Sequence, residues 1–429
     1  MEVVFSNKSS LQGRLRVPGS KSYTHRAYLT AALLEGGKIS HPLECDDTRA
    51  TRLCLQGFNC EFRTTESGLE IRKNGGDLIR TDRFLAGESG TLLRFLLPVC
   101  TVGSGPEEVT ISGRGSLKKR SNKIIVASIR ENGFQIQATG EEATVPITCY
   151  PGQKLHQTPV RVDASTTSQL LSGWLLALAA AGGGEAEVKD RLVSAPYVDM
   201  TAEVLREAGV TVEEQDDKNY EVQPEQVRSL EYDVPGDYSA AAFFIAGAAL
   251  AGDGVKLAGL RREGRQADRR IVEIMRNLGA DVQWEKDELV IRGPIQPSGF
   301  EVDASDCPDL VPVLAVVGSQ ASAAVKIKNI SHLANKESDR INMTCRELEK
   351  IGLKIIPGAD EINIHRSASR LHNDHVRLEA HNDHRLAMAF SILGICRGNL
   401  TVTGAKSISK SYPDFYSDLA SLEANFQKK

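Results

Sequence analysis

One arrangement of apolar and polar residues recurs six times along the chain. A short alternating segment is followed by small polar residues, a long apolar stretch, a glycine-rich stop and another alternating segment. Alternation with a period of two predicts strands, and a long apolar stretch predicts a helix buried on all sides. The copies recur every 68 residues (18 to 86) to 78 residues (303 to 381), so they indicate a repeated unit. They begin at Pro18, Ala86, Asp163, Pro235, Asp303 and His381.

The rest of each repeat also follows one pattern. After the apolar helix of the first copy, residues 38–42 predict a strand, 46–57 an amphipathic helix, and 60–65 and 69–74 two strands. Each unit is therefore βαβαββ, which makes the chain an α/β protein with three such units in each of two domains. The sixth copy ends after a helix near 412–425 and lacks two strands. We expect the surplus N-terminal segments EVVFS and LQGRLRV to complete it.

This count divides the chain into a continuous domain, 18–234, and a discontinuous domain, 1–17 plus 235–429. The chain crosses between them near Pro18 and Pro235, which predicts a hinge and a cleft that closes around a ligand. The apolar helices begin with Ser, Thr, Asp or Asn, which suit helix N-termini. If the three helices of a domain run parallel, their N-termini gather at one end and form an anion site facing the cleft.

Composition narrows the class of protein. Apolar residues make up 41% and charged residues 25%, and 52 Lys and Arg against 56 Asp and Glu give a net charge of −4. This balance provides no basic field for nucleic acid or a membrane surface. No apolar stretch has the length of a membrane span, and the N-terminus has no signal-peptide pattern. Eight scattered cysteines predict reduced, mostly buried thiols. We therefore expect a cytoplasmic protein, and a monomer because no exposed apolar helix is predicted.

Against this acidic balance, cationic residues cluster near the starts of several apolar helices, where a purely structural role would favour neutral or acidic side chains. The segments concerned are PGSKSYTHRA, ESGTLLR, the basic loop ending at Arg120, DASTTSQ, SAPY, NKESDR, HNDHR and the residues around Lys410. Together, and in this order over essentially the whole chain, they resemble the EPSP synthase (3-phosphoshikimate 1-carboxyvinyltransferase) family. The fold of that family, two domains of three βαβαββ units with buried helices (an inside-out α/β barrel), agrees with the repeat count.

The resemblance implies a reaction and a set of residues. The family transfers the enolpyruvyl group of phosphoenolpyruvate (PEP) to the 5-hydroxyl of shikimate 3-phosphate without metal or cofactor. Shikimate 3-phosphate would be bound by Lys21, Ser22, Arg26, Thr167, Ser168, Gln169, Ser194, Tyr197, Asp309 and Lys336. PEP would be bound by Lys21, Gly90, Arg120, Gln169, Arg340, Arg385 and Lys410. Asp309 and Glu337 would be the acid–base pair, with Lys21 also near the reacting centre.

Local patterns allow simpler roles for some of these residues. Asp309 could cap a helix, Glu337 and Arg340 could form a surface i,i+3 pair, and Ser22, Ser168 and Ser194 could be caps. HNDH occurs at 372–375 and 381–384, and paired HxxH spacings can hold a metal. The second copy alone matches the family motif, so we expect no metal.

Glu88 departs from the family pattern, which has Asn at this position. A carboxylate next to an anion site requires a cation, and Arg94 and Lys21 are the candidates. His332 stands where the family often has Asn. Gly90 is retained and would leave room beside PEP, so we expect the anion glyphosate to compete with PEP.

Two alternative functions stay open. The sister family transfers enolpyruvyl to UDP-N-acetylglucosamine, but it carries a reactive cysteine in a loop that here reads RGSLKKRSNK. A non-catalytic anion-binding protein would not need Asp309 and Glu337 to face anions.

Overall fold

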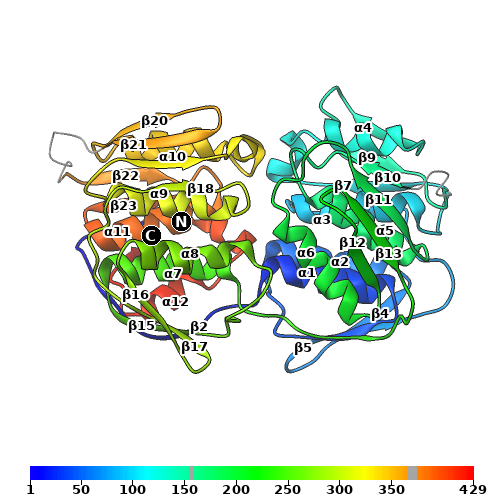
Figure 1. Ribbon diagram of the computed structural model, residues 1–429, viewed down its shortest axis with the longest axis horizontal. Helices are drawn as coiled ribbons and strands as arrows, with labels where there is room; N and C mark the ends of the chain where they lie inside the picture. The colour runs from blue at the N-terminus through cyan, green and yellow to red at the C-terminus, as the bar shows by residue number, and fades with distance from the viewer. Residues whose placement is uncertain (154–158, 366–373) are drawn as a thin grey trace. The chain divides into compact units, whose positions relative to one another are not determined.

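The computed structural model describes residues 1–153, 159–365 and 374–429. The chain folds into two compact units (Figure 1). Unit 1 consists of Met1–Pro18 and Pro235–Lys429, and unit 2 of Gly19–Val234. Within the described ranges each unit contains three four-stranded sheets. The fold is α/β.

The three sheets of unit 2 share one topology. In each, the first two strands are parallel and the remaining pairs are antiparallel. In hydrogen-bonding order, the first sheet is β14 (Leu230–Asp233), β3 (Gly37–Ser40), β5 (Gly68–Lys73) and β4 (Cys60–Thr64). The second is β6 (Arg83–Leu85), β7 (Val109–Ser112), β9 (Thr144–Cys149) and β8 (Ile136–Thr139). The third is β10 (Val160–Val162), β11 (Gly184–Val188), β13 (Asn219–Gln223) and β12 (Thr211–Glu214).

Unit 1 repeats this topology with strands from both ends of the chain. Its first sheet is β2 (Leu11–Arg16), β15 (Gly252–Ala258), β17 (Glu288–Arg292) and β16 (Asp281–Glu285). The second is β18 (Glu301–Asp303), β19 (Val325–Lys328), β21 (Glu361–His365) and β20 (Lys354–Pro357). The third is β22 (Val376–Glu379), β23 (Leu400–Thr403), β1 (Val3–Phe5) and β24 (Gln427–Lys428).

The N-terminal segments complete two repeats instead of one. β1 joins the sheet of the sixth repeat, as expected, but β2 pairs in parallel with β15 of the fourth repeat. The expectation that LQGRLRV completes the sixth repeat was therefore wrong. The missing strand is β24, because the last helix spans Phe415–Ser421 and leaves residues to pair with β1. In unit 2, β14 similarly completes the first repeat by pairing with β3.

One helix of each repeat lies in the core of its unit. These helices are α1 (Lys21–Leu33), α3 (Gly90–Val102) and α5 (Gln169–Ala180) in unit 2, and α7 (Tyr238–Ala251), α9 (Val311–Ser319) and α11 (His384–Arg397) in unit 1. Their side chains are almost all buried, as their apolar sequences predict. Close packing is visible at Gly173 of α5, where a Cβ would lie 2.6 Å from the carbonyl oxygen of Arg94 in α3.

A second helix in each repeat is amphipathic and packs against this core. These helices are α2 (Asp46–Cys54), α4 (Lys123–Glu131), α6 (Pro196–Glu207), α8 (Arg270–Asn277), α10 (Arg340–Glu349) and α12 (Phe415–Ser421). Short 3₁₀ turns carry several of the charged residues discussed below. They are η1 (Leu55–Gly57), η2 (Gly115–Lys119), η3 (Ala267–Arg269), η4 (Pro308–Leu310), η5 (Ser331–Asn335) and η6 (Ala405–Lys410).

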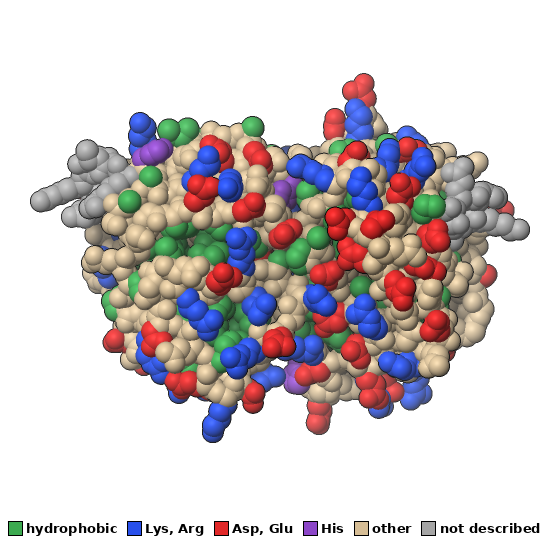
Figure 2. Space-filling model, viewed as in Figure 1, with side chains coloured by type: hydrophobic (Ala, Val, Ile, Leu, Met, Phe, Trp, Pro, Cys, Tyr) green, Lys and Arg blue, Asp and Glu red, His purple; other side chains and the backbone are tan. Residues whose placement is uncertain are grey.

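The surface of each unit mixes both signs of charge. On the visible face, Lys and Arg side chains are interspersed with Asp and Glu (Figure 2). All eight cysteines are unpaired thiols, and Cys396 alone among them is partly exposed. Among the helices that the structure describes, none has the length and hydropathy to cross a bilayer.

Candidate functional site in two groups of residues

The first group of sequence-predicted residues lies at helix starts of unit 2. Lys21, Gly90 and Gln169 are the first residues of α1, α3 and α5. Ser20 and Ser89 cap α1 and α3 through their side chains, and Thr167 accepts a hydrogen bond from the Gln169 amide. Each helix start thus presents a predicted ligand at the positive end of its dipole.

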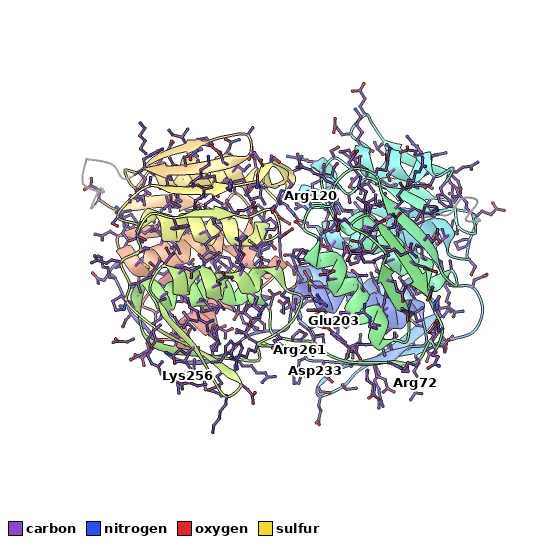
Figure 3. All side chains as sticks on the ribbon, viewed as in Figure 1. Arg72, Arg120, Glu203, Asp233, Lys256 and Arg261 are labelled. Carbon is purple, nitrogen blue, oxygen red and sulfur yellow. The ribbon has the colours of Figure 1, made fainter. Side chains whose placement is uncertain are left out.

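Around Gly90 the structure gathers an arginine pair and an amide. The Gln169 carboxamide accepts a 2.5 Å hydrogen bond from Nη1 of Arg94, and its Nε2 donates to Oγ1 of Thr91 at 2.8 Å. A Cβ on Gly90 would lie 2.8 Å from Nη1 of Arg120 and 3.2 Å from Nη1 of Arg94. The space that the missing side chain leaves therefore borders two guanidiniums. Arg120 follows the turn η2 and is buried (Figure 3).

Glu88 lies next to this group and contacts the same turn. Its Oε2 accepts hydrogen bonds from the amide (3.1 Å) and hydroxyl (3.0 Å) of Ser116. The close approach needs a glycine at 115, because a Cβ there would lie 2.2 Å from the carboxyl carbon of Glu88. We expected Arg94 or Lys21 to balance this carboxylate; Arg94 bonds Gln169 and Lys21 pairs with Asp47, and a contact of either cation with Glu88 stays a prediction. Glu88 therefore anchors the turn that ends at Arg120.

Arg26 is buried inside unit 2 and is held by neutral acceptors. Its nitrogens donate to the carbonyls of Ser22 (2.9 Å) and Tyr197 (2.6 Å) and to the hydroxyls of Thr201 and Ser172. Its guanidinium also lies 5.1 Å from the ring centre of Phe95. Burial lowers the pKa of Arg26 to about 10, against the opposing effect of nearby tyrosines. The arginine ties α1 to α5 and α6.

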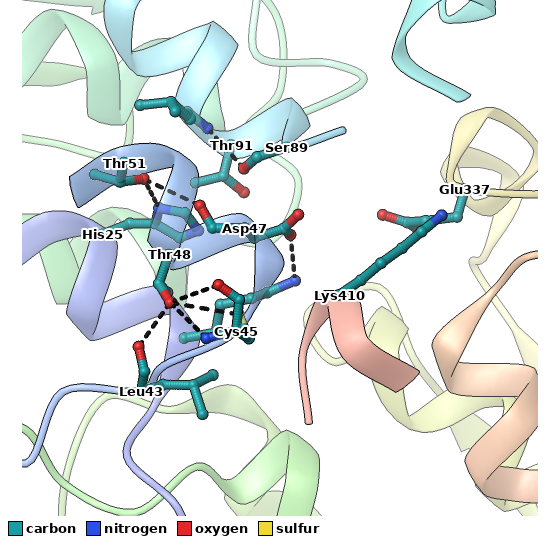
Figure 4. A network of polar contacts seen from close by, with 12 residues as sticks. His25, Leu43, Cys45, Asp47, Thr48, Thr51, Ser89, Thr91, Glu337 and Lys410 are labelled. Carbon is teal, nitrogen blue, oxygen red and sulfur yellow. Dashed lines mark hydrogen bonds and ion pairs between the residues drawn. The ribbon is translucent and has the colours of Figure 1, made fainter. Parts of the chain in front are cut away.

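Lys21 is connected to α2 by a second polar network. Its ammonium lies 3.0 Å from Oδ2 of Asp47, and both side chains are nearly buried (Figure 4). In the same helix pair, Thr51 bonds Nδ1 of the buried His25 at 2.6 Å. Burial, and then the charges of Lys21 and Arg26, lower the pKa of His25 well below its usual value. The histidine is therefore neutral, and Asp47 is a partner of Lys21 that the sequence reasoning missed.

The predicted serines are not side-chain caps. Ser22 is the second residue of α1, behind the true cap Ser20, and Ser168 precedes α5 without a side-chain capping bond. Ser194 has a positive φ of 55° before α6, and its carbonyl accepts from the Tyr197 amide. The capping interpretation was wrong for these three serines.

The second group lies in unit 1 and is organised by Asp309. Its Oδ1 accepts from Nη1 of Arg340 at 2.7 Å, and its Oδ2 accepts from Nη2 of Arg385 at 2.8 Å. Asp309 therefore bridges two predicted PEP ligands from α10 and α11. Its carboxylate does not cap α9, whose first turn follows η4.

Arg340 is the most fully ion-paired residue of this group. Besides Asp309 it contacts Glu337 (2.7 Å) and Asp383 (2.8 Å), and its side chain is 2% exposed. Burial alone would lower the pKa of Arg340, but the three carboxylates raise it well above its usual value. In the Glu337–Arg340 pair the arginine is buried and the glutamate is partly buried, so its interpretation as a surface pair was wrong.

A constrained turn places the start of α11. His381 and Asn382 both have positive φ, and Glu347 holds them by accepting from the Glu379 amide and bonding the His381 ring. Asp383 then caps α11 and accepts from the Arg385 amide at 2.8 Å. Sequence reasoning missed Glu347 and Asp383, although both support Arg385 or Arg340.

The remaining predicted residues of unit 1 lie near this turn or on η5. Nζ of Lys410, at the end of η6, donates to the Asn382 carbonyl at 3.0 Å and reaches toward Glu337 (Figure 4). Lys336 follows η5, which also carries His332. The first HNDH copy includes His372 and Asn373, which lie outside the described residues. Within the described ranges, no group of three or more metal-ligating side chains occurs.

Comparisons with known proteins agree on one family. A model of EPSP synthase (3-phosphoshikimate 1-carboxyvinyltransferase) matches residues 5–419. A 3-phosphoshikimate 1-carboxyvinyltransferase of Methanothrix thermoacetophila is 34% identical over 99% of both chains. One from Methanothermobacter thermautotrophicus is 33% identical over 97% of both chains.

Solved structures give the same result for the fold. An EPSP synthase from Acinetobacter baumannii has a TM-score of 0.79 and 26% identity over 99% of both chains. The enolpyruvyl transferase NikO from Streptomyces tendae has a TM-score of 0.73 at 16% identity, over 99% of this chain and 98% of its own, and shows the shared fold alone. Since the family model and relatives above 30% identity cover nearly the whole chain, the protein belongs to the EPSP synthase family.

Proposed function

We propose that the protein transfers the enolpyruvyl group of PEP to the 5-hydroxyl of shikimate 3-phosphate. The products are 5-enolpyruvylshikimate 3-phosphate and inorganic phosphate, a step of the shikimate pathway toward chorismate and the aromatic amino acids. The observation that carries this proposal is the family match across residues 5–419, with relatives named for this reaction over nearly their full length.

The residues of unit 2 are assigned mainly to shikimate 3-phosphate. A phosphate is held best by cations and by amides at helix starts, and Lys21, Ser168 and Gln169 lie at such starts. The full proposed set is Lys21, Ser22, Arg26, Thr167, Ser168, Gln169, Ser194 and Tyr197, with Asp309 and Lys336 from unit 1. Arg26 acts through Tyr197 and Ser22, whose carbonyls it bonds.

PEP is assigned to cations of both units. In unit 2 these are Lys21 and Arg120. Gly90 is included because it borders Arg120 and Arg94, and Gln169 because it bonds Arg94. In unit 1 they are Arg340, Arg385 and Lys410. Several guanidiniums are needed because two like charges 4 Å apart repel by about 4 kcal/mol at an effective dielectric constant of 20.

The chemistry requires a base and an acid. The 5-hydroxyl oxygen attacks C2 of PEP as a base takes its proton and an acid protonates the methylene carbon, which gives a tetrahedral ketal that carries phosphate. Loss of a proton from the new methyl group and of phosphate from C2 then restores the enol ether. Asp309 is proposed as the base and Glu337, or Lys21, as the acid. Arg340 holds both carboxylates through charge-assisted hydrogen bonds.

Phosphate release separates this proposal from its alternatives. The protein is assayed with PEP and either shikimate 3-phosphate or UDP-N-acetylglucosamine, and the organic product is identified by mass. With PEP present, we expect phosphate release when shikimate 3-phosphate is the acceptor and none when UDP-N-acetylglucosamine is the acceptor. Release with the nucleotide sugar would assign the sister activity, and binding of PEP without release with either acceptor would indicate an anion-binding protein. The turn Gly115–Lys119 and its flanks contain no cysteine, which favours the first outcome.

We also propose that the protein acts as a monomer in the cytoplasm. In the described part of the chain, the exposed large apolar residues are Met1, Leu53, Leu85, Ile124 and Ile356, too few for a large apolar patch. Eight unpaired cysteines suit a reducing compartment. Light scattering after size exclusion should give a mass near 46.6 kDa, and twice that mass would contradict the monomer.

A further inference from the structure

Asp268 is a buried acid to which the proposed reaction gives no role. It lies in η3, just before α8, and is 2% exposed. Its Oδ2 shares a short hydrogen bond with the hydroxyl of Ser239. Within the described residues, its Oδ1 has no hydrogen-bond partner. A buried carboxyl with one partner is costly to keep, so its position needs an explanation.

The segment that carries Asp268 clamps the start of α7. Gln266 donates to the Gly236 carbonyl (2.8 Å) and accepts from the Tyr238 amide (2.9 Å). Asp268 adds the bond to Ser239, the second residue of α7. Side chains of Gln266 and Asp268 therefore hold this helix start at two backbone groups, those of Gly236 and Tyr238, and at the hydroxyl of Ser239.

Ser239 connects this clamp to the reacting residues. Its backbone carbonyl accepts a 2.9 Å hydrogen bond from Nη1 of Arg385, while Nη2 of the same guanidinium contacts Asp309. A continuous chain of contacts thus runs from Asp268 through Ser239 and Arg385 to Asp309. A shift of Ser239 would rotate the Arg385 fork away from its two acceptors, and with it the proposed contact with PEP.

We propose that Asp268 is a positioning residue for enolpyruvyl transfer: it fixes Ser239, whose carbonyl orients Arg385 toward Asp309 and PEP. This inference rests on the proposed function, since it assigns PEP to Arg385. Asp268 touches neither substrate in this proposal and acts through Ser239.

The charges around Asp268 give it a second effect. Burial, and then the charge of Asp309, raise the pKa of Asp268 to about 7, opposed by Arg385 and by the Ser239 bond. Asp237, at the start of α7, also raises it, and the thiol of Cys307 lies close enough to respond to the Asp268 charge. Near neutral pH the carboxyl is therefore partly protonated. When it ionises, its charge offsets that of Arg385 and weakens the attraction for anionic PEP.

Three variants test the connection. Asp268→Ala and Ser239→Ala each remove the same side-chain bond, so both should raise KM for PEP about tenfold, and KM for shikimate 3-phosphate by less than threefold. Asp268→Asn keeps an oxygen acceptor for the Ser239 hydroxyl and should keep kcat within threefold of wild type. In the wild type, ionisation of Asp268 should raise KM for PEP between pH 6 and 8, and in Asp268→Asn this rise should be smaller. PEP itself titrates equally in both assays, so the difference between the two pH profiles isolates the effect of Asp268.

Controls distinguish positioning from stability and from the function itself. Asp418→Asn removes a carboxyl of unit 1 that is partly buried and bonded to Tyr412, and it should leave KM for PEP unchanged. If Asp268→Ala fails to fold, Ser239→Ala and Asp268→Asn carry the test. Variants that lower the melting temperature but leave the KM values and the pH profile unchanged would overturn the proposal. Wild-type protein that releases no phosphate would instead refute the proposed function.

Discussion

Two buried arginines, Arg26 in unit 2 and Arg340 in unit 1, show how differently the two groups of residues treat positive charge. Both are almost inaccessible to solvent. Arg26 donates to carbonyls and hydroxyls, whereas Arg340 contacts three carboxylates. Burial lowers the pKa of Arg26, and the carboxylates raise that of Arg340 above its usual value.

The difference matches the two tasks in the proposed reaction. A guanidinium among neutral acceptors keeps its positive charge available to attract a phosphate at the helix starts of unit 2. A guanidinium that contacts carboxylates attracts an anion less strongly, but it also holds those carboxylates in fixed positions. In the proposed reaction unit 2 therefore contributes mainly to binding the anions, whereas unit 1 both binds PEP and places the groups that move protons.

The largest expected effect comes from the carboxylate at the centre of unit 1. Asp309→Asn keeps the size of the side chain but removes the proposed base, so kcat should fall by about 10²–10⁴-fold, a larger effect than the rise in the KM values from losing one guanidinium contact. Stopped-time phosphate assays measure both constants. Turnover close to wild type would remove Asp309 from the proton transfers and leave it a pure bridge between Arg340 and Arg385.

Replacing each buried arginine by methionine tests the comparison directly. Arg340→Met would leave three carboxylates close together without their cation, which should destabilise unit 1 by about 3–5 kcal/mol. Arg26→Met would strand neutral acceptors and should cost about 1–3 kcal/mol. Urea unfolding at pH 7 measures both changes. Equal losses would show that the carboxylates around Arg340 relax into solvent when it is removed.

Measuring the free energy of unfolding over a pH series tests the raised pKa of Asp268, a buried carboxyl whose hydrogen-bond partner is a hydroxyl. Its pKa of about 7 in the folded protein lies above the ordinary value of 3.8. Between about pH 4 and 7 the folded state therefore holds a proton that the unfolded state has lost, so this group's contribution to stability falls as pH rises through that window. Relative to wild type, Asp268→Asn should gain about 3 kcal/mol between pH 4 and 7, at about 1.4 kcal/mol for each pKa unit. A constant difference across the window would contradict the raised pKa.

The smallest expected effect is at the arginine pair of unit 2. The Cβ of Gly90→Ala would displace the end of Arg120, which is flexible enough to move. We expect KM for PEP to rise about tenfold, equivalent to about 1.4 kcal/mol, with kcat little changed. Glyphosate inhibition of the wild type should be competitive with PEP, and a non-competitive pattern would contradict the shared subsite. Gly75→Ala adds the same methyl group where it would meet nothing within 4 Å, and it is the matched control.

The sequence allowed the repeats and the family to be predicted, but not the partners of the charged residues. Apolar stretches between glycines and polar caps identify the core helices because those features are local. The sheet that β2 joins could not be predicted from such local features. A strand's partner depends on which sheet, formed by distant residues, still has an unpaired edge strand. Likewise, Asp309 looks like a cap and Glu337–Arg340 like a surface pair until Asp383 is brought beside them from 43 residues away. Long-range ion pairs have no signature in one sequence.

The strands β2 and β14 also have a consequence for synthesis on the ribosome. Each strand completes the first sheet of its unit by pairing with a strand that is distant in the sequence. β14 can pair with β3 only after about two hundred further residues have been synthesised, and β2 can pair only once β15 has been synthesised. Unit 2 can therefore finish while much of unit 1 is still untranslated, and β2 must stay unpaired, open to wrong partners, for that whole interval. The two positive charges of β2, Arg14 and Arg16, would keep this unpaired strand from pairing with copies of itself on neighbouring ribosomes.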